Sequence, residues 1–136
     1  MPYIIKTDPR SGNAGNAGNA GDALTFCEKP FYCERRIKRD DDCFIWFSET
    51  KGGTGLTWRS RVRSVISRDG RKLDVNVLLT SFANRPSIGK DALEPFRDAI
   101  GSTPMHELAR KLYRHAHNKI CEIDQDEFQF LLTYFG

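Results

Sequence analysis

The stretch from Leu56 to Phe82, LTWRSRVRSVISRDGRKLDVNVLLTSF, decides the fold class of this chain. From Leu56 to Ser67, apolar and polar positions alternate, which is typical of a β-strand with one buried face. One face of this expected strand carries Trp58, Val62 and Ile66. The other face carries the arginines Arg59, Arg61 and Arg63.

A second strand follows a tight turn. Arg68-Asp69-Gly70 is a hairpin signal, because aspartate and glycine accept the backbone conformations that short turns need. The range 72–82 then predicts the partner strand, whose inward face carries Leu73, Val75, Val77 and Leu79. Long antiparallel strands joined by short turns favour a meander that curls into a small barrel.

The flanking segments predict further strands and short helices. Strands are expected at 3–6, at 43–48 and at 118–123, and the second of these is apolar on both faces. Helices are expected at 34–39, at 91–100, after a cap at Ser102 or Thr103 followed by Pro104, and after Asp124, which has capping-box spacing to Glu127. The predicted fold is therefore α+β, a mixed β-barrel of five to seven strands flanked by short helices.

Length and composition favour one domain over residues 1–136. The chain has 136 residues, 39% of them hydrophobic, and a net charge of only +3. The Gly/Asn/Ala repeat at 11–21 is expected to be a flexible loop. The start of the chain does not resemble a signal peptide and no apolar run is long enough to span a bilayer, so a cytoplasmic location without membrane contact is expected.

Three segments occur in a recognisable order along the chain. The first is YIIKTDP at 3–9, the second is FIWFS at 44–48 with the strand that follows, and the third runs from LYR at 112–114 to DQDE at 124–127. In this order they resemble the EVE family of the PUA-like superfamily, which is related to ASCH and YTH modules. In the segment after the first loop the family's Trp-Asp pair is missing, and Tyr32 and Arg35 stand where the family has Tyr and Arg. The resemblance implies a PUA-like pseudo-barrel that binds RNA or DNA, with recognition of a modified base.

Residue chemistry adds candidates for such contacts. A base taken out of its stack needs an aromatic platform and hydrogen bonds to its edge. The candidate base-contacting residues are Lys6, Thr7, Tyr32, Arg35, Trp46, Ser48, Glu49, Trp58, Arg114, His117 and Asn118. The candidate phosphate contacts are Arg59, Arg61 and Arg63. Each tryptophan also fits a core position, and each charged residue also fits a solvated surface.

Two other functions stay open. A small ASCH-like amidohydrolase acting on a modified nucleoside needs a lysine, a hydroxyl and a carboxylate in one pocket, and Lys6, Thr7 and Glu49 are of those types. A protein-interaction accessory domain is expected instead if the basic clusters at 35–39, 59–63 and 111–119 do not surround one cleft. No cofactor or metal is expected, because the cysteines lack paired metal-ligand spacing, and a binding role is preferred to an enzymatic one.

Overall fold

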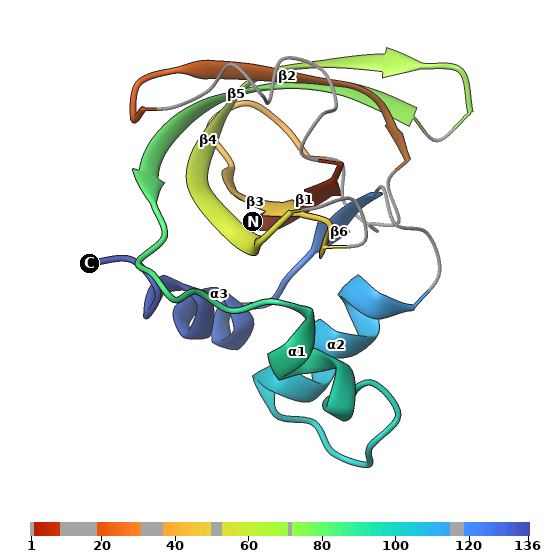
Figure 1. Ribbon diagram of the computed structural model, residues 1–136. Coiled ribbons are helices and arrows are strands. Elements are labelled where there is room, and N and C mark those ends of the chain that lie inside the picture. The colour runs from red at the N-terminus through yellow and green to blue at the C-terminus, as the bar shows by residue number, and fades with distance from the viewer. Residues whose placement is uncertain (1, 9–18, 31–36, 50–52, 71, 115–118) are drawn as a thin grey trace.

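A computed structural model gives the structure of the chain and describes residues 2–8, 19–30, 37–49, 53–70, 72–114 and 119–136. Within these residues the protein is α+β, with one curved mixed sheet and short helices against one of its faces (Figure 1). The repeat loop expected at 11–21 lies mostly outside the described residues. So does most of the helix expected at 34–39, and residues 37–39 are not helical.

The sheet contains six strands among the described residues. They are β1 (Tyr3–Thr7), β2 (Ala23–Pro30), β3 (Asp42–Phe47), β4 (Gly55–Arg68), β5 (Lys72–Phe82) and β6 (Lys119–Glu122). The order across the sheet is β2-β5-β4-β3-β1-β6. The β3–β4–β5 meander is antiparallel as predicted, β1 is parallel to β3, and β6 is antiparallel to β1.

The expected barrel is an open sheet. The strand order ends at β2 on one side and β6 on the other, and no ladder joins these two edge strands in the described part of the chain. The sheet nevertheless curls strongly around its inner face (Figure 1). The strand number falls within the predicted range, but closure does not occur. Strand β2 itself was not predicted, because the segment from 22 to 42 has mixed polarity.

Bulges in β4 decide which side chains face inward. Trp58 pairs with Ile45 and Leu56 pairs with Trp46, so Thr57 is an extra residue in β4. Val62 pairs with Val77 and Ser64 pairs with Asn76, which makes Arg63 a second extra residue. An extra residue reverses the alternation that follows it.

Because of the second bulge, the prediction that Ile66 faces inward is wrong. Trp58 and Val62 lie in the inner core as expected, but Val65 packs against that core in place of Ile66. Ile66 is 55% exposed. On β5 the inward positions are those the alternation predicts, since Leu73, Val75, Val77 and Leu79 are all buried in the inner core.

Apolar side chains form a separate core on each face of the sheet. The inner core lies within the curl of the sheet and includes Tyr3, Ile5, Ile45 and Trp58. The helix-side core lies between the sheet and the helices and includes Ile4, Phe44, Trp46, Leu108 and Leu131. Neighbours in β1 and β3 alternate between the two cores, as expected for strands covered on both faces.

The helices are short and begin at well-formed caps. They are α1 (Lys90–Leu93), the 3₁₀ turn η3 (Glu94–Phe96), α2 (Pro104–Tyr113) and α3 (Gln125–Leu132). Thr103 caps α2, and the Asp124 side chain accepts a hydrogen bond of 2.8 Å from the Glu127 backbone, as predicted. The helix predicted at 91–100 ends early, because Pro95 has no N–H to continue the α-helical ladder. None of the described helices is long and apolar enough to cross a membrane.

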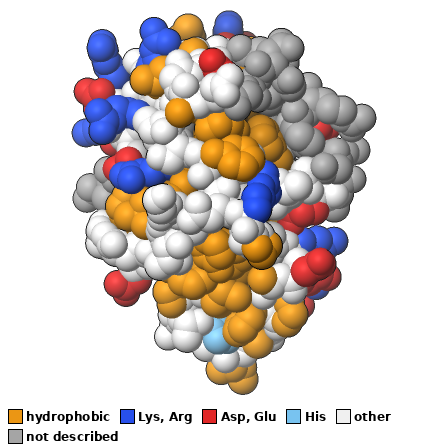
Figure 2. All heavy atoms as spheres, turned by 60° about the vertical axis from the view of Figure 1, so that its left-hand side comes forward, with side chains coloured by type: hydrophobic (Ala, Val, Ile, Leu, Met, Phe, Trp, Pro, Cys, Tyr) orange, Lys and Arg blue, Asp and Glu red, His pale blue; other side chains and the backbone are white. Residues whose placement is uncertain are grey.

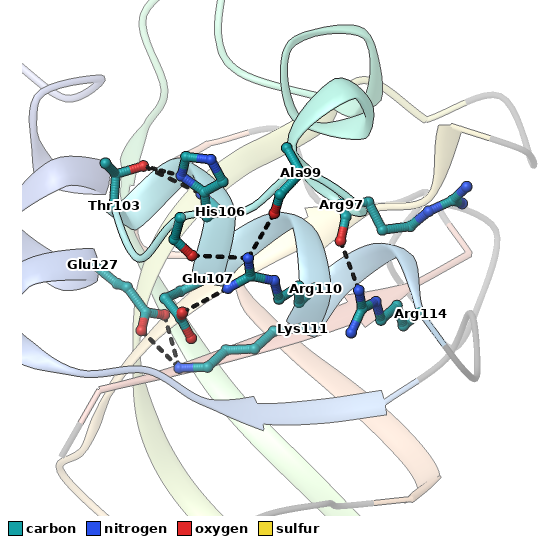
Figure 3. A network of polar contacts seen from close by, with 10 residues as sticks. Arg97, Ala99, Thr103, His106, Glu107, Arg110, Lys111, Arg114 and Glu127 are labelled. Atoms are coloured by element: carbon teal, nitrogen blue, oxygen red, sulfur yellow. Dashed lines mark hydrogen bonds and ion pairs between the residues drawn. The ribbon is translucent and has the colours of Figure 1, made fainter.

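Two arginine side chains, one in α2 and one directly after it, hold the loop that precedes this helix (Figure 3). Arg110 donates to the carbonyl oxygens of Ala99 and Gly101, each at 2.8 Å. Arg114 donates to the Arg97 carbonyl oxygen at 2.8 Å. These contacts satisfy loop carbonyls that no secondary structure pairs, which holds the loop against the helix.

Gly55, at the start of β4, allows a close approach of two backbone segments. Its φ of +83° is one that residues with a side chain rarely adopt, and a Cβ here would lie 2.5 Å from the Ile88 carbonyl oxygen. Gly70 in the β4–β5 turn has a φ of +69° with no atom within 4 Å of such a Cβ. A side chain at Gly70 would therefore meet only backbone strain, whereas one at Gly55 would meet both backbone strain and a steric clash.

Gly55→Ala is expected to lower the free energy of unfolding by roughly 3 kcal/mol, because strain and overlap act together. Gly70→Ala, the matched control, is expected to cost about 1 kcal/mol from the backbone conformation alone. Urea denaturation of both variants measures the difference. Equal losses in the two variants would contradict the close packing of Gly55 against residues 88–89.

Candidate functional site

Three of the predicted site residues form a buried polar cluster with Tyr113. Lys6 on β1 pairs in register with Trp46 on β3, and both side chains lie on the helix side of the sheet. The Lys6 Nζ donates to the Leu112 carbonyl oxygen at 2.5 Å and lies 4.1 Å from the centroid of the Tyr113 ring. We call Lys6, Trp46, Glu49 and Tyr113 the polar cluster.

Glu49 is the acceptor at the centre of the polar cluster. Its carboxylate accepts from the Tyr113 hydroxyl at 2.7 Å and from the Trp46 Nε1 at 3.3 Å. It also accepts from the Lys90 backbone N–H at the start of α1. The carboxylate thus joins the end of β3 to α1 and α2, and three donors already occupy it.

Burial shifts the pKa values of Lys6 and Tyr113 in the polar cluster. The Lys6 side chain is 1% exposed. This burial, together with nearby Lys119, lowers the Lys6 pKa to about 8, and Glu49 opposes the shift. Burial also raises the pKa of the Tyr113 phenol far above its ordinary value, with a further contribution from its hydrogen bond to Glu49. The phenol therefore remains a hydrogen-bond donor at neutral pH.

Thr7 and Ser48 lie next to members of the polar cluster in sequence. Thr7 follows Lys6 along β1, so its side chain points to the opposite face of the sheet. The Thr7 hydroxyl is buried and has no hydrogen-bond partner among the described residues. The backbones of the two residues are joined, because the Ser48 N–H donates to the Thr7 carbonyl oxygen at 2.7 Å.

Both predicted aromatic platforms are core residues in this structure. Trp46 is 0% exposed in the helix-side core, and Trp58 is 4% exposed in the inner core. Trp58 meets Phe82 edge to face, with ring centroids 4.8 Å apart. Neither indole presents a free face on which a base could stack.

The predicted arginine ladder divides into two parts. Arg59 is paired with Asp42 at 3.2 Å and lies over the Phe128 ring. Arg61 and Arg63 instead line an open groove of about 350 Å³ on the outer face of the β4–β5 hairpin. The residues that line this arginine groove are Arg39, Asp40, Arg61, Val62, Arg63, Ser64, Asn76 and Leu78.

Backbone hydrogen bonds bring Arg39 into the arginine groove from a distant part of the chain. The Asp40 N–H donates to the Val62 carbonyl oxygen at 2.9 Å, and the Val62 N–H donates to the Asp41 carbonyl oxygen at 3.0 Å. Asp40 turns the chain with a φ of 73°, which aspartate tolerates better than most residues. Figure 2 shows Lys and Arg side chains gathered near the upper end of one face of the molecule, apart from a broad hydrophobic area lower down.

The third basic cluster lies elsewhere. Lys111 forms an ion pair with the buried Glu127 at 2.7 Å, and Arg114 contacts the loop before α2 (Figure 3). Lys119 is buried and donates to the Arg114 carbonyl oxygen at 2.7 Å. Two of the three basic clusters therefore contribute residues to one groove, and the described basic residues as a whole do not surround a single cleft, which is the arrangement expected of a protein-interaction accessory domain. The predicted contacts Tyr32, Arg35, His117 and Asn118 lie outside the described residues.

Several residues of these two sites were not predicted. Tyr113 fitted the apolar face of its helix, and no sequence signal marks its hydroxyl as a partner of Glu49. Asn76 was detectable, since it is a polar residue on the outward face of a strand next to the arginine strand. Arg39 belonged to a recognised basic cluster, but its place in the groove depends on the fold.

Within the described residues, no group of three or more histidine, cysteine, aspartate or glutamate side chains lies close enough together to hold a metal ion. Cys43 and Cys121 are buried, and burial raises the pKa of each thiol. Both behave as small apolar side chains.

No protein-family model, curated protein or solved structure matches this chain.

Glu49→Ala is expected to lower the free energy of unfolding by roughly 3 kcal/mol. The substitution leaves the Tyr113 hydroxyl and the Lys90 N–H without their acceptor in a largely buried site. The Trp46 N–H keeps only its second acceptor, the Tyr113 hydroxyl oxygen at 3.1 Å. Glu94→Ala is the control, because that exposed carboxylate pairs with Lys90 only at the surface and is expected to contribute under about 1 kcal/mol. Chemical denaturation compares the variants, and similar losses would contradict the central role of Glu49.

Lys6→Met is expected to remove a pH-dependent component of stability. The folded-state pKa of Lys6 is about 8 and its unfolded value is 10.5, so the unfolded chain binds more protons between these pH values. Wild-type stability should therefore rise from about pH 8 to pH 10.5, by up to roughly 3 kcal/mol from this group. Denaturation curves across this range should show a smaller rise in Lys6→Met and the full rise in Lys38→Met, which alters an exposed lysine.

Proposed function

We propose that this chain is a nucleic-acid-binding module that holds a phosphate backbone in the arginine groove. The observation that carries the proposal is the convergence of Arg39, Arg61 and Arg63, from two separate segments, on one open groove of about 350 Å³. Guanidinium groups bind phosphate through paired N–H donors. Phosphate contacts of this kind provide most of the affinity of nucleic-acid-binding proteins.

The state of the groove side chains supports this role. No carboxylate in the described part of the chain forms an ion pair with Arg39, Arg61 or Arg63, whereas Arg59 is already paired. Among the described residues that line the groove, Asp40 is the one acidic residue. The Asn76 amide donates to Thr25 at 2.8 Å and leaves its carbonyl oxygen available to a ligand. The net charge of +3 is too small to drive binding alone, so affinity depends on this local concentration of charge.

A finer form of the proposal comes from the resemblance to the EVE family. It implies a PUA-like fold and recognition of a modified base, in DNA or RNA. The curled mixed sheet with helices on one face is compatible with that fold class. The burial of Trp46 and Trp58 means that base recognition at those residues requires their side chains to move from the positions described.

The polar cluster favours a second candidate, an ASCH-like amidohydrolase acting on a modified nucleoside. Lys6, with a pKa of about 8, lies beside a carboxylate and the Tyr113 hydroxyl. Against this role, Glu49 already accepts hydrogen bonds from three donors, and Lys6 is closed off from solvent. Release of ammonia or a changed nucleoside mass on incubation with modified cytidines would favour the hydrolase.

The double substitution Arg61→Gln with Arg63→Gln tests the binding proposal. The logarithm of the affinity for single-stranded oligonucleotides should fall with the logarithm of the salt concentration, and loss of two phosphate contacts should reduce that slope by about 1.4. Fluorescence anisotropy across a salt series measures the slope for DNA and RNA strands. Arg97→Gln, which removes an arginine outside the groove, should retain the wild-type slope. An unchanged slope in the double variant would contradict the proposal.

A further inference from the structure

Asp40 places a negative charge in the arginine groove. Its side chain is exposed and, within the described part of the chain, forms no ion pair or side-chain hydrogen bond, although Arg39, Arg61 and Arg63 line the same groove. A carboxylate at this position repels the phosphates that the arginines attract. Asp40 therefore weakens the binding of a phosphate backbone unless the ligand also brings a hydrogen-bond donor to it.

The backbone turn at Asp40 does not explain the charge. The residue has a φ of 73°, and its N–H donates to the Val62 carbonyl oxygen at 2.9 Å, so its position beside β4 is fixed. Asparagine and glycine also adopt this left-handed conformation, and neither carries a charge. The turn thus determines where the side chain lies but does not require a carboxylate there.

The other groups in the arginine groove suit a sugar-phosphate backbone better than a base. The Asn76 amide donates to Thr25 at 2.8 Å, and its carbonyl oxygen is a second acceptor for a ligand. None of the described lining residues is aromatic, Val62 is only 1% exposed and Leu78 is half-buried. The described lining therefore offers no aromatic ring on which a base could stack.

The backbones of RNA and DNA differ in a single hydrogen-bond donor. Phosphate and deoxyribose oxygens within a DNA strand only accept, whereas each ribose of RNA adds a 2′-hydroxyl that can donate. We propose that the Asp40 carboxylate accepts a hydrogen bond from a ribose 2′-hydroxyl, so that the arginine groove selects RNA over DNA. The inference rests on the proposed function and names the sugar of its ligand.

The position of the 2′-hydroxyl in the strand supports this assignment. The hydroxyl belongs to the sugar that joins two consecutive phosphates, so an acceptor beside phosphate-binding arginines lies near it. The amino groups of bases lie on the far side of the sugar from the phosphates. A carboxylate accepts only, and a hydrogen bond to a charged group is stronger than one between neutral groups. Asp40 thus gains a partner from RNA, and DNA leaves only its repulsion of phosphate.

The test compares a single-stranded oligouridylate with its 2′-fluoro analogue by fluorescence anisotropy. The analogue has the same bases, length and charge and a ribose-like sugar pucker, but no 2′ donor. The wild-type protein is expected to bind the oligouridylate roughly tenfold or more tightly, the effect of one charge-assisted hydrogen bond. Asp40→Gly, which permits the same turn, is expected to remove most of this preference. The same variant should bind the 2′-fluoro strand more tightly than the wild type does, because the repulsion is gone.

Asp69→Asn is the matched control. It removes the same charge from an exposed position in the β4–β5 turn, outside the described lining of the arginine groove, and should retain the wild-type preference. A loss of preference in Asp69→Asn equal to that in Asp40→Gly would assign the effect to net charge and would overturn the inference. A circular dichroism spectrum and a thermal transition matching the wild type establish that each variant is folded.

The remaining outcomes separate this inference from the proposed function. Equal wild-type binding of the two strands would overturn the 2′-hydroxyl contact and leave the nucleic-acid function in place. A wild-type preference that survives in Asp40→Gly would overturn the role of Asp40. If the wild-type protein binds neither these strands nor a DNA strand of the same length at low salt, the proposed function itself fails.

Discussion

The arrangement of the helices on the sheet depends on the hydrogen bonds that the Glu49 carboxylate accepts. Its three donors come from the end of β3, the start of α1 and the end of α2, which are far apart in the chain. A buried carboxylate is stable only when it is paired or hydrogen-bonded, so each donor position is constrained by the others. Lys6, beneath the Tyr113 ring, extends this constraint to β1. The helix-side core then fills the space that these polar contacts define.

Local chemistry predicted much of the fold. The caps at Thr103 and Asp124 and the turn at Gly70 depend on neighbouring residues, so sequence was sufficient to find them. The bulges in β4 depend on pairing with β3 and β5, and nothing within β4 reveals them. Strand β2 was missed for a similar reason, because its Glu-Lys-Pro end becomes a strand only beside β5. Closure of the sheet was overestimated, since a meander predicts curling and does not specify what the edge strands contact.

The candidate sites likewise contain some residues that the sequence identified and others whose position depends on contacts between distant parts of the chain. Parallel pairing of β1 with β3 brings Lys6 beside Trp46, and the Lys6-Thr7 and Trp46-Ser48-Glu49 segments were identified from the sequence. Alternation along β1 then sends Thr7 to the other face, which its position in the chain alone already implied. The arginine groove was only half predictable. Arg61 and Arg63 lie on one strand, whereas Arg39 joins them through backbone hydrogen bonds between residues 40–41 and Val62.

The placement of the two tryptophans has a consequence for spectroscopy. The chain contains two tryptophans, and they lie on opposite faces of one sheet, Trp46 in the helix-side core and Trp58 in the inner core. A chain with phenylalanine in place of either one would carry a single fluorophore that reports on one core. Because each indole is buried, its emission would shift to longer wavelength when that core becomes hydrated. Intrinsic fluorescence can thus follow the unfolding of each side of the sheet separately, without an added label.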